Sequence, residues 1–509
     1  MNARPDAAQA LRYALLSLIG LCAIGLGDVI LRYTYSLYLS FEPTGFLQGG
    51  SYLLAAAAVF AMLGAWVDRP QNTNQLTARA ARALLLALLL VALFQVFRQS
   101  LATALPLPGW AKALAMVGCV AVATGLAWRM SPASAYRLGD AAGLAMLTLF
   151  LLQPGMGSYL VGAFSPVRQE AVPAPQQIVP PTRRSIVIIF DEWDMEISEQ
   201  SGLFERPDMR ELLAQSFFAR NALPAGSNTL ESIPSMLIGQ PFGEIADGST
   251  ARLRSKSGQE WTPQTAQLFS DLQTSNISHA VVGYYHDYCA LITTARHCHA
   301  EPVQFFQGWE AQFKRIFSRS GQFDFPYSVF QRQWQATYQR LQQEALRAVE
   351  DRSNAMVWVH INVPHPPSAI AQGTHRDLRS DYLANLQLTA DLITAVRARL
   401  QAQGDEATLV LTSDHWLRER ELWSAMYEQQ RGPGTGSAGK TTDLRVPLII
   451  WFSKDATPVQ HPAVTSTIAM RRLVPALLEG RLTNPQEVAG FFAQQPTPSA
   501  PRLDGTRVH

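Results

Sequence analysis

The residues best suited to chemistry lie at the ends of apolar runs of the sequence. One run ends directly before Asp191 and Glu192, and another ends shortly before the pair Asp414 and His415. A carboxylate combined with an Asp-His pair is a ligand set that suits Zn²⁺ or Mn²⁺. The pattern therefore predicts a divalent-metal site, although a single Asp after a strand is more often a turn or helix-cap residue.

Two histidines extend this pattern to a third apolar run. His360 lies in the run Met356–Ile361, and His365 follows it within His-Ile-Asn-Val-Pro-His-Pro-Pro. A lone His near Pro is usually structural, but carboxylates and imidazoles at the ends of three runs favour a shared site. In open α/β sheets, ligands bind outside the carboxyl ends of the strands, so we expect these groups to meet at one sheet edge.

Thr229 is the candidate nucleophile. It lies in the segment 226–239, which begins as a polar loop and continues as a short apolar helix. Free N–H groups and the macrodipole at a helix N-terminus favour an anionic phosphoryl group. A hydroxyl on a bound metal loses its proton more readily and becomes a competent nucleophile. The alternative is that Thr229 or Ser227 merely caps the helix.

The elements that must position these residues alternate between two patterns. Short continuous apolar runs predict buried strands, and longer helical patterns lie between them. Strands buried on both faces and alternating with helices indicate an α/β domain with a largely parallel central sheet. The predicted strands are Ser185–Phe190, His279–Val282, Met356–Ile361, Ala407–Thr412 and Val446–Phe452, and the predicted helices are Asp208–Phe218, Ser328–Glu350, Ser380–Gln403 and Thr465–Leu478.

Residues 1–164 are of a different kind, because from residue 11 onward they are nearly all apolar. A helix needs roughly 20 apolar residues to cross a bilayer, with about 17 as a practical minimum. Five apolar stretches predict a domain of five transmembrane helices, at residues 13–31, 52–67, 83–97, 110–128 and 141–164. A buried helical core, or a signal peptide for the first stretch, is the alternative. Five stretches in succession, without a small-residue cleavage pattern after the first, disfavour it.

Basic residues in the short loops give the orientation of these predicted spans. Arginines concentrate before the first span, between the second and third, and between the fourth and fifth. We therefore expect the N-terminus inside and everything after residue 164 outside. This corresponds to a multi-pass protein of the cytoplasmic (inner) membrane with its C-terminal part on the periplasmic or extracytoplasmic side.

The rest of the chain divides into three parts. Residues 165–184 contain several prolines and no apolar periodicity, which predicts a stiff linker. Residues 185–492 have the mixed composition of a globular domain and are enough for a full core. Residues 493–509, rich in Pro and Gln, are predicted to be disordered. A net charge of +2 over 509 residues gives no reason to expect a nucleic-acid partner.

Two of the four cysteines lie in the predicted exported part. Cys289 and Cys298 are nine positions apart, and in an oxidising compartment a local disulfide is the natural interpretation. The rival interpretation is a metal site that adds His297 and His299 to the two cysteines. Its spacing matches no established zinc pattern.

At these positions the chain resembles the alkaline-phosphatase superfamily, in its sulfatase-like branch. It is most similar to the membrane-anchored phosphoethanolamine and phosphoglycerol transferases, which include the lipoteichoic acid synthases. The resemblance rests on Glu192 after the first strand, on Thr229 in a Thr-x-x-Ser-x-Pro setting, and on the Ser-Asp-His that contains Asp414. It covers nearly the whole chain, because these enzymes combine N-terminal membrane spans, a linker and an exported catalytic domain.

The resemblance implies roles for the matched residues. Glu192, Asp414 and His415 would bind the metal, with Asp191 as a reserve carboxylate ligand, and Thr229 would be the nucleophile.

Three histidines would act on the substrate. The resemblance implies that His365, which precedes Pro366, contacts the substrate and takes part in catalysis, and that His286 is a further substrate contact. His360, in the same apolar run, is also predicted to bind the substrate.

The implied function is the transfer of a phospho-alcohol group from a membrane phospholipid donor to a cell-envelope lipid or glycan acceptor. Sulfate-ester hydrolysis is disfavoured, because it needs a Cys or Ser convertible to formylglycine in a Cys/Ser-x-Pro-x-Arg frame. In this chain Thr229 occupies the position of the Cys or Ser nucleophile, and Ile233 occupies the position of the motif's Arg.

Two departures keep other functions open. Trp193 follows Glu192, and Trp416 follows His415 where the family usually has Gly. Bulky residues there would narrow the site or mark altered activity. The alternatives are a metal-dependent phosphodiesterase or phosphatase that uses water as acceptor, and a non-enzymatic envelope-assembly protein with a degenerate site.

Overall fold

The structure is a computed structural model of the chain. It describes residues 183–243, 245–249, 252–262, 267–301, 327–370, 378–418, 443–454 and 456–496, together with isolated residues elsewhere. The chain divides into two compact units. One comprises Met1–Thr34, Phe41–Phe164 and Gln304–Arg319, and the other comprises Tyr35–Ser40, Ser165–Val303 and Ser320–His509.

A nine-stranded mixed sheet forms the centre of the second unit. Its order is β13-β3-β12-β11-β2-β10-β7-β8, with β14 beside β3, and every neighbouring pair is parallel except those made by β12. The strands are β2 Arg183–Asp191, β3 Ser216–Leu223, β7 His279–Tyr284, β8 His297–Glu301, β10 Met356–Pro364, β11 Glu406–Ser413, β12 Val446–Phe452, β13 Val459–His461 and β14 Thr465–Ser466.

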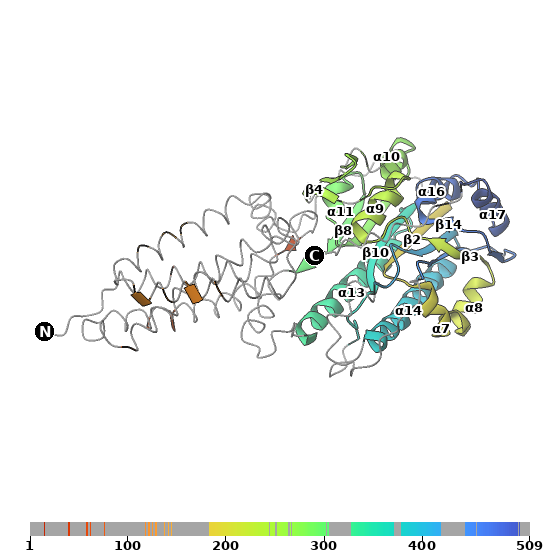
Figure 1. The fold of residues 1–509 in the computed structure, drawn as a ribbon. Coiled ribbons are helices and arrows are strands. Elements are labelled where there is room, and N and C mark those ends of the chain that lie inside the picture. The colour runs from red at the N-terminus through yellow and green to blue at the C-terminus, as the bar shows by residue number, and fades with distance from the viewer. Residues whose placement is uncertain are drawn as a thin grey trace. The chain divides into compact units, whose positions relative to one another are not determined.

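Helices cover both faces of this sheet (Figure 1). The helices are α7 Met195–Gln200, α8 Pro207–Leu213, α9 Thr229–Ile238, α10 Gln267–Thr274, α11 Tyr288–Leu291, α13 Tyr327–Glu350, α14 Leu378–Gln403, α16 Met470–Leu478 and α17 Pro485–Ala493, with short 3-10 turns at Leu203–Glu205 and Thr467–Ala469. The long helices α13 and α14 lie side by side on one face. The helices α9, α10 and α16 lie on the other.

The alternation of side chains along β2 explains the two layers. Ile186, Ile188 and Phe190 face the core shared with α13 and α14. Val187 and Ile189 face the second core, which includes side chains of α9, α10 and α16. Successive strand residues point to opposite faces, and both faces here are covered, so the strand reads as a continuous apolar run.

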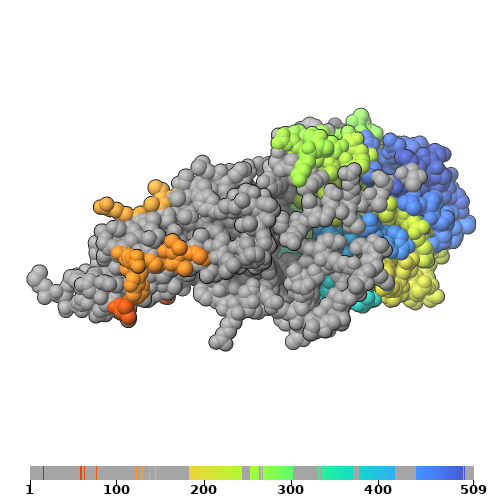
Figure 2. Space-filling model, viewed as in Figure 1, coloured from red at the N-terminus to blue at the C-terminus, as the bar shows by residue number. Residues whose placement is uncertain are grey.

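Smaller elements complete the described chain. A three-stranded antiparallel sheet contains β4 Ile245–Ser249, β5 Arg252–Ser255 and β6 Glu260–Trp261, and β1 Leu39–Ser40 pairs with β9 Val303–Gln304. The C-terminal elements lie beside the segment that contains α8 and β3, far away in sequence (Figure 2). There β13 pairs with β3 and α17 packs on it.

The structure confirms the α/β architecture with its mostly parallel sheet and all five predicted strands. Two predicted helices were partly wrong. Asp208–Phe218 is helical only as far as Leu213, because its last residues belong to β3, which pairs with β12. Thr465–Leu478 begins as β14 and a 3-10 turn, and α16 starts only at Met470.

The five predicted membrane spans fall almost entirely outside the described residues. Within the part of the chain that the structure describes, no helix is both long and apolar enough to cross a membrane. The predicted linker is likewise outside, except that its last two residues begin β2 at Arg183. Of the predicted tail, α17 includes residue 493, and residues 499–509 are not described.

Candidate active site

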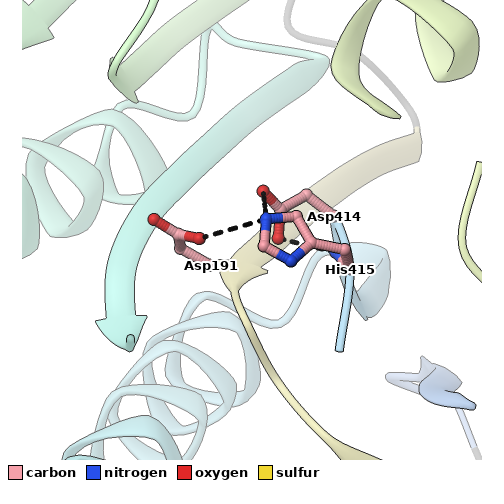
Figure 3. Close-up of side chains that lie close together, drawn as sticks. All are labelled: Asp191, Asp414 and His415. Carbon is pink, nitrogen blue, oxygen red and sulfur yellow. Dashed lines mark hydrogen bonds and ion pairs between the residues drawn. The ribbon is translucent and has the colours of Figure 1, made fainter. Parts of the chain in front are cut away.

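Asp191, Asp414 and His415 form a buried trio at the carboxyl end of the sheet. Their side chains point toward one another (Figure 3). His415 Nε2 lies 3.8 Å from Asp191 Oδ1 and 3.4 Å from Asp414 Oδ2. Each residue offers one ligand atom, and these atoms all lie within 4.8 Å of one another.

Two neighbouring parallel strands deliver this trio. Asp191 is the last residue of β2, and Asp414 and His415 follow the end of β11, which pairs with β2. Ser413 ties the two strand ends together. Its Oγ donates to the Phe190 carbonyl at 2.7 Å and accepts from the Trp193 N–H at 2.6 Å.

The imidazole of His415 is held in one orientation. Its Nδ1 lies 3.0 Å from the carbonyl oxygen of Trp416, which can only accept, so Nδ1 carries the proton. Nε2 is therefore the unprotonated nitrogen, and it faces Asp191 and Asp414. A backbone carbonyl in this place is a common way to fix the tautomer of a metal-binding histidine.

Thr229 is the first residue of α9 and lies against the trio. Its Oγ1 donates to Asp414 Oδ2 at 2.7 Å and lies 3.3 Å from His415 Nε2. The helix cap is Asn228, whose side chain accepts from the Glu231 N–H at 3.1 Å. The Thr229 hydroxyl is therefore not needed as a cap and is left for the site.

Burial makes the negative charge of this site costly. It raises the pKa of Asp191 well above its usual range, helped by Asp414 and Glu192, and it raises the pKa of Asp414 to about 7. Asp191 Oδ1 is buried without a hydrogen-bond partner. A divalent cation would offset both effects, so Asp191, Asp414 and His415 fit a metal ion, with Thr229 beside it.

Glu192 takes a different place from Asp191. Its backbone has a left-handed φ of 62°, and its Oε1 accepts from Arg418 Nε at 3.0 Å. The same oxygen lies 4.0 Å from His415 Nδ1, the nitrogen that does not face the other two acids. The trio thus contains Asp191, the reserve ligand of the sequence prediction. Arg418 escaped that prediction because its signal is only an Arg four positions after Asp414.

The three predicted substrate histidines surround the trio at different depths. His360 is fully buried, and its Nε2 lies 3.8 Å from Asp414 Oδ2. His286 is also buried, with Nε2 3.4 Å from the Thr229 carbonyl oxygen. His365 is half-buried beside Trp334, whose ring centroid is 4.7 Å away. Burial lowers the pKa of His286 to about 4 and those of His360 and His365 to about 3.

Tyr288, which sequence motifs did not single out, positions His360. Its hydroxyl lies 2.9 Å from His360 Nδ1, and the Tyr284 carbonyl oxygen lies 3.1 Å from the same nitrogen. Nδ1 therefore carries the proton, and Nε2 turns an unprotonated, unpartnered nitrogen toward Asp414.

The two tryptophans beside the site have different structural roles. Trp193 is buried in the core with Phe190 and Phe204, and its Nε1 donates to Ser198 Oγ at 3.0 Å. Trp416 is also buried and orients His415 through its carbonyl oxygen. Trp193 thus belongs to the core, and its bulk does not narrow the site.

The structure joins Cys289 and Cys298 in a disulfide, which confirms that prediction. Both sulfurs are used in this bond, so the rival Cys/His metal site is excluded. The bridge links α11 to β8, directly beside Tyr288.

Comparison with known proteins places this fold. The family model described as Sulfatase matches residues 186–479. No curated protein matches the chain. The lipooligosaccharide phosphoethanolamine transferase A (EptA) of Neisseria meningitidis is similar in structure, with 14% identity, coverage of 93% of this chain and 96% of that chain, and a TM-score of 0.36.

Two further solved structures show the same likeness. The lipoteichoic acid synthase LtaP of Listeria monocytogenes has 10% identity, with 61% of this chain and 76% of that chain covered and a TM-score of 0.36. A protein of the alkaline phosphatase superfamily from Vibrio parahaemolyticus has 11% identity, with 61% and 72% covered and a TM-score of 0.34.

Proposed function

This chain belongs to the sulfatase family, and we propose that it is a metal-dependent transferase that moves a phospho-alcohol group from a membrane phospholipid to a cell-envelope lipid or glycan. The observation that carries the proposal is the place of Thr229. Its hydroxyl donates to Asp414 at 2.7 Å, beside His415 and at the N-terminus of α9. This is where a nucleophile would meet both a metal and the positive end of a helix.

The residue type at this position favours phosphoryl transfer over sulfate hydrolysis. Threonine cannot be converted to formylglycine, and no arginine stands at Ile233. A threonine alkoxide instead forms a phosphodiester with the transferred group, which a second alcohol can resolve. We assign Asp191, Asp414 and His415 as the groups that would hold Zn²⁺ or Mn²⁺, and leave Glu192 as a predicted further ligand.

The reaction then follows in two balanced steps. Thr229 Oγ loses its proton and attacks the phosphorus of the donor, and the phosphorus–oxygen bond to diacylglycerol breaks. The alkoxide of diacylglycerol takes up a proton and leaves, with the phospho-alcohol bonded to Thr229. An acceptor hydroxyl then gives up its proton and attacks the same phosphorus, the bond from phosphorus to Thr229 Oγ breaks, and Thr229 takes up the proton that the acceptor lost. A bound metal would lower the pKa of the Thr229 hydroxyl and offset charge on the phosphoryl oxygens.

Neutral histidines suit the two remaining tasks, which are contact with the substrate and transfer of protons. His360 and His286 are buried, and their lowered pKa values keep them uncharged near neutral pH. His365 is the half-buried member of the set, so it is the one placed to contact an incoming substrate. We assign it the role of stabilising the phosphoryl group or moving a proton.

Two observations support a site outside the cytoplasm on a membrane anchor. The disulfide between Cys289 and Cys298 is typical of an oxidising compartment. Isolated described residues within the predicted spans are helical with exposed apolar side chains, for example Leu15, Val59 and Leu144 at 51%, 50% and 67% exposure. A lipid donor would share the interface with the enzyme.

Replacement of Thr229 tests the proposal. We expect Thr229→Ala in the full-length, metal-loaded chain to lower cleavage of labelled phosphatidylethanolamine or phosphatidylglycerol by at least about a thousandfold. The wild-type chain should also yield a phospho-alcohol adduct on Thr229 by mass spectrometry. Thr274→Ala is the matched control, because that hydroxyl bonds only to its own helix through the Ser270 carbonyl.

The outcome distinguishes the competing functions. Undiminished lipid cleavage by Thr229→Ala would refute the mechanism. Release of the phospho-alcohol into water, with no acceptor modified, would show a hydrolase. Absence of bound Zn or Mn together with no cleavage would favour the non-enzymatic protein.

A further inference from the structure

A fully buried amide on α14, that of Asn385, bonds to the loop that carries His365. We call residues 364–369 the His365 loop. Asn385 Nδ2 donates to the carbonyl oxygens of His365 and Pro367, each at 2.9 Å. Its Oδ1 accepts from the Ala369 N–H at 2.7 Å. A single side chain thus holds the loop at several points of its backbone.

Trp334 on α13 holds the same histidine from a second side. Its Nε1 donates to the His365 carbonyl oxygen at 3.0 Å, the oxygen that Asn385 also contacts. The two rings lie with their centroids 4.7 Å apart and their planes inclined by 32°. The His365 N–H donates to the carbonyl oxygen of Asp191 at 3.0 Å. The backbone of His365 is therefore fixed to the strand end that carries the trio.

The imidazole of His365 has one nitrogen suited to the reaction. Its Nδ1 lies 2.5 Å from the Pro366 carbonyl oxygen, which can only accept, so Nδ1 carries the proton and Nε2 is the basic nitrogen. Such a nitrogen has to lie at the right place, because a displacement of about 1 Å can cost about a hundredfold in rate. The place of this ring depends on its backbone, which Asn385 and Trp334 hold.

We propose that Asn385 and Trp334 are positioning residues, which act on the reaction through His365 and touch neither the substrate nor the metal. This inference rests on the proposed function, because it assumes that His365 acts on the transferred phosphoryl group. Asn385 suits the task because one amide both donates and accepts, so it can bond to several main-chain groups of a loop at once. Its removal also weakens the fold, so positioning has to be measured separately from stability.

A double-mutant cycle separates the two roles. The quantities are kcat and KM for cleavage of labelled phosphatidylethanolamine or phosphatidylglycerol by the full-length, metal-loaded chain. We expect Asn385→Ala to lower kcat by about tenfold to a hundredfold and to change KM by less than about threefold. In the His365→Ala background the same change should lower kcat no further, because the group that Asn385 positions is already gone.

Asn354→Ala is the matched control. Asn354 is also fully buried, and its Nδ2 donates to the Ala348 carbonyl oxygen at 3.1 Å, at the opposite end of β10 from the His365 loop. The control should weaken the fold and leave kcat of the folded chain unchanged. Trp334→Phe is the second variant, because it keeps an aromatic ring but loses the Nε1 donor. It should lower kcat in the same non-additive way.

A second readout does not depend on activity. Diethyl pyrocarbonate modifies unprotonated imidazole nitrogens, and tandem mass spectrometry follows its rate of reaction at His365. We expect Asn385→Ala and Trp334→Phe to raise this rate by at least about threefold, because a loosened loop opens more often and exposes the ring. Asn354→Ala should leave the rate as in wild type.

Additive losses of kcat in the double variant would overturn the proposal, because Asn385 would then act independently of His365. An unchanged modification rate in Asn385→Ala would overturn it as well. Should Asn385→Ala fail to fold, Trp334→Phe decides by the same two measurements. Failure of the proposed function would be seen separately, as lipid cleavage that survives Thr229→Ala, and the modification rate of His365 does not depend on that result.

Discussion

Buried acids dominate the chemistry at the scale of single residues. Asp191, Glu192, Asp194 and Asp414 all lie within or next to the carboxyl ends of β2 and β11, and each is almost fully buried. Glu192 forms an ion pair with Arg418, Asp194 caps a helix, and Asp191 and Asp414 lie together where a metal ion would fit. Changes of pH act on stability through buried acids whose pKa is shifted, and Asp194 is the one that lies outside the trio.

Asp194 allows the clearest pH prediction. It caps α7 by accepting from the Ile197 N–H at 2.9 Å, and burial raises its pKa to about 7 from a usual 3.8. The folded chain thus holds a proton that the unfolded chain has lost. This stabilisation is complete below about pH 4 and is lost as pH rises to about 7.

Asp194→Asn keeps the cap but cannot ionise. Relative to wild type, we expect its free energy of unfolding to be unchanged near pH 4 and higher at pH 8, by on the order of 1 kcal/mol for each unit of pKa shift realised. Urea unfolding of the full-length chain at several pH values measures this. A difference that stays constant with pH would contradict it.

Asp208→Asn should show the opposite sign. A hydrogen bond from Arg206 lowers the pKa of Asp208 to about 2, so its stabilisation is present above pH 4 and fades at lower pH. In the same urea unfolding measurement, the free energy of unfolding of the variant should be lower than that of wild type at neutral pH and should approach it in acid.

At the scale of elements, close packing between β7 and α11 positions the histidines. A Cβ added at Gly283 in β7 would lie 2.2 Å from the Tyr288 ring, and the Tyr288 hydroxyl lies 2.9 Å from His360 Nδ1. The absence of a side chain at Gly283 therefore allows the contact that fixes the His360 tautomer. The glycine in β7 thus leaves the space that the Tyr288 ring needs in order to reach His360.

Gly283→Ala should displace Tyr288 and destabilise the chain by about 1 to 3 kcal/mol, because the ring has to shift within a packed core. Donor-lipid cleavage should fall as His360 loses its partner. Gly490→Ala in α17 is the control. Nothing lies within 4 Å of an added Cβ there, and the change should be neutral or slightly stabilising. Equal stability of the two variants would refute this packing role.

At the scale of the whole molecule, the second unit, which contains the C-terminal part of the chain, combines a sulfatase-family fold with a disulfide. A nine-stranded sheet with two helical layers gives the unit a core of its own. Disulfides of this kind are typical of proteins that fold in an oxidising compartment. Location is therefore a testable property of the entire chain.

Cys289 and Cys298 should resist a maleimide–polyethylene glycol reagent when cells are denatured without a reductant, and react after reduction. Two added labels after reduction would give the expected gel shift, and Cys289→Ser with Cys298→Ser is the control that should lose it. Reaction of both thiols without reduction would argue against an exported C-terminal unit. Loss of the bridge should cost about 2 to 4 kcal/mol of stability.

Local sequence determined most of the architecture. The continuous apolar runs predicted β2, β7, β10, β11 and β12, because strands buried on both faces must be apolar throughout. The position of Thr229 at a helix start and the pairing of the two cysteines were also readable from neighbouring residues. The segment at 216–218 was not, because its strand character depends on pairing with β12.

The tertiary structure alone decided where the side chains of the two adjacent acids lie. Asp191 and Glu192 have equivalent chemistry, and sequence favoured Glu192 as the ligand. A left-handed backbone at Glu192 and the distant Arg418 bring Glu192 into an ion pair and leave Asp191 beside His415. Such a choice rests on a contact between residues 226 positions apart, and short-range patterns carry no information about it. The sequence thus determined which groups gather at the sheet edge, and the packing determined which of them face one another.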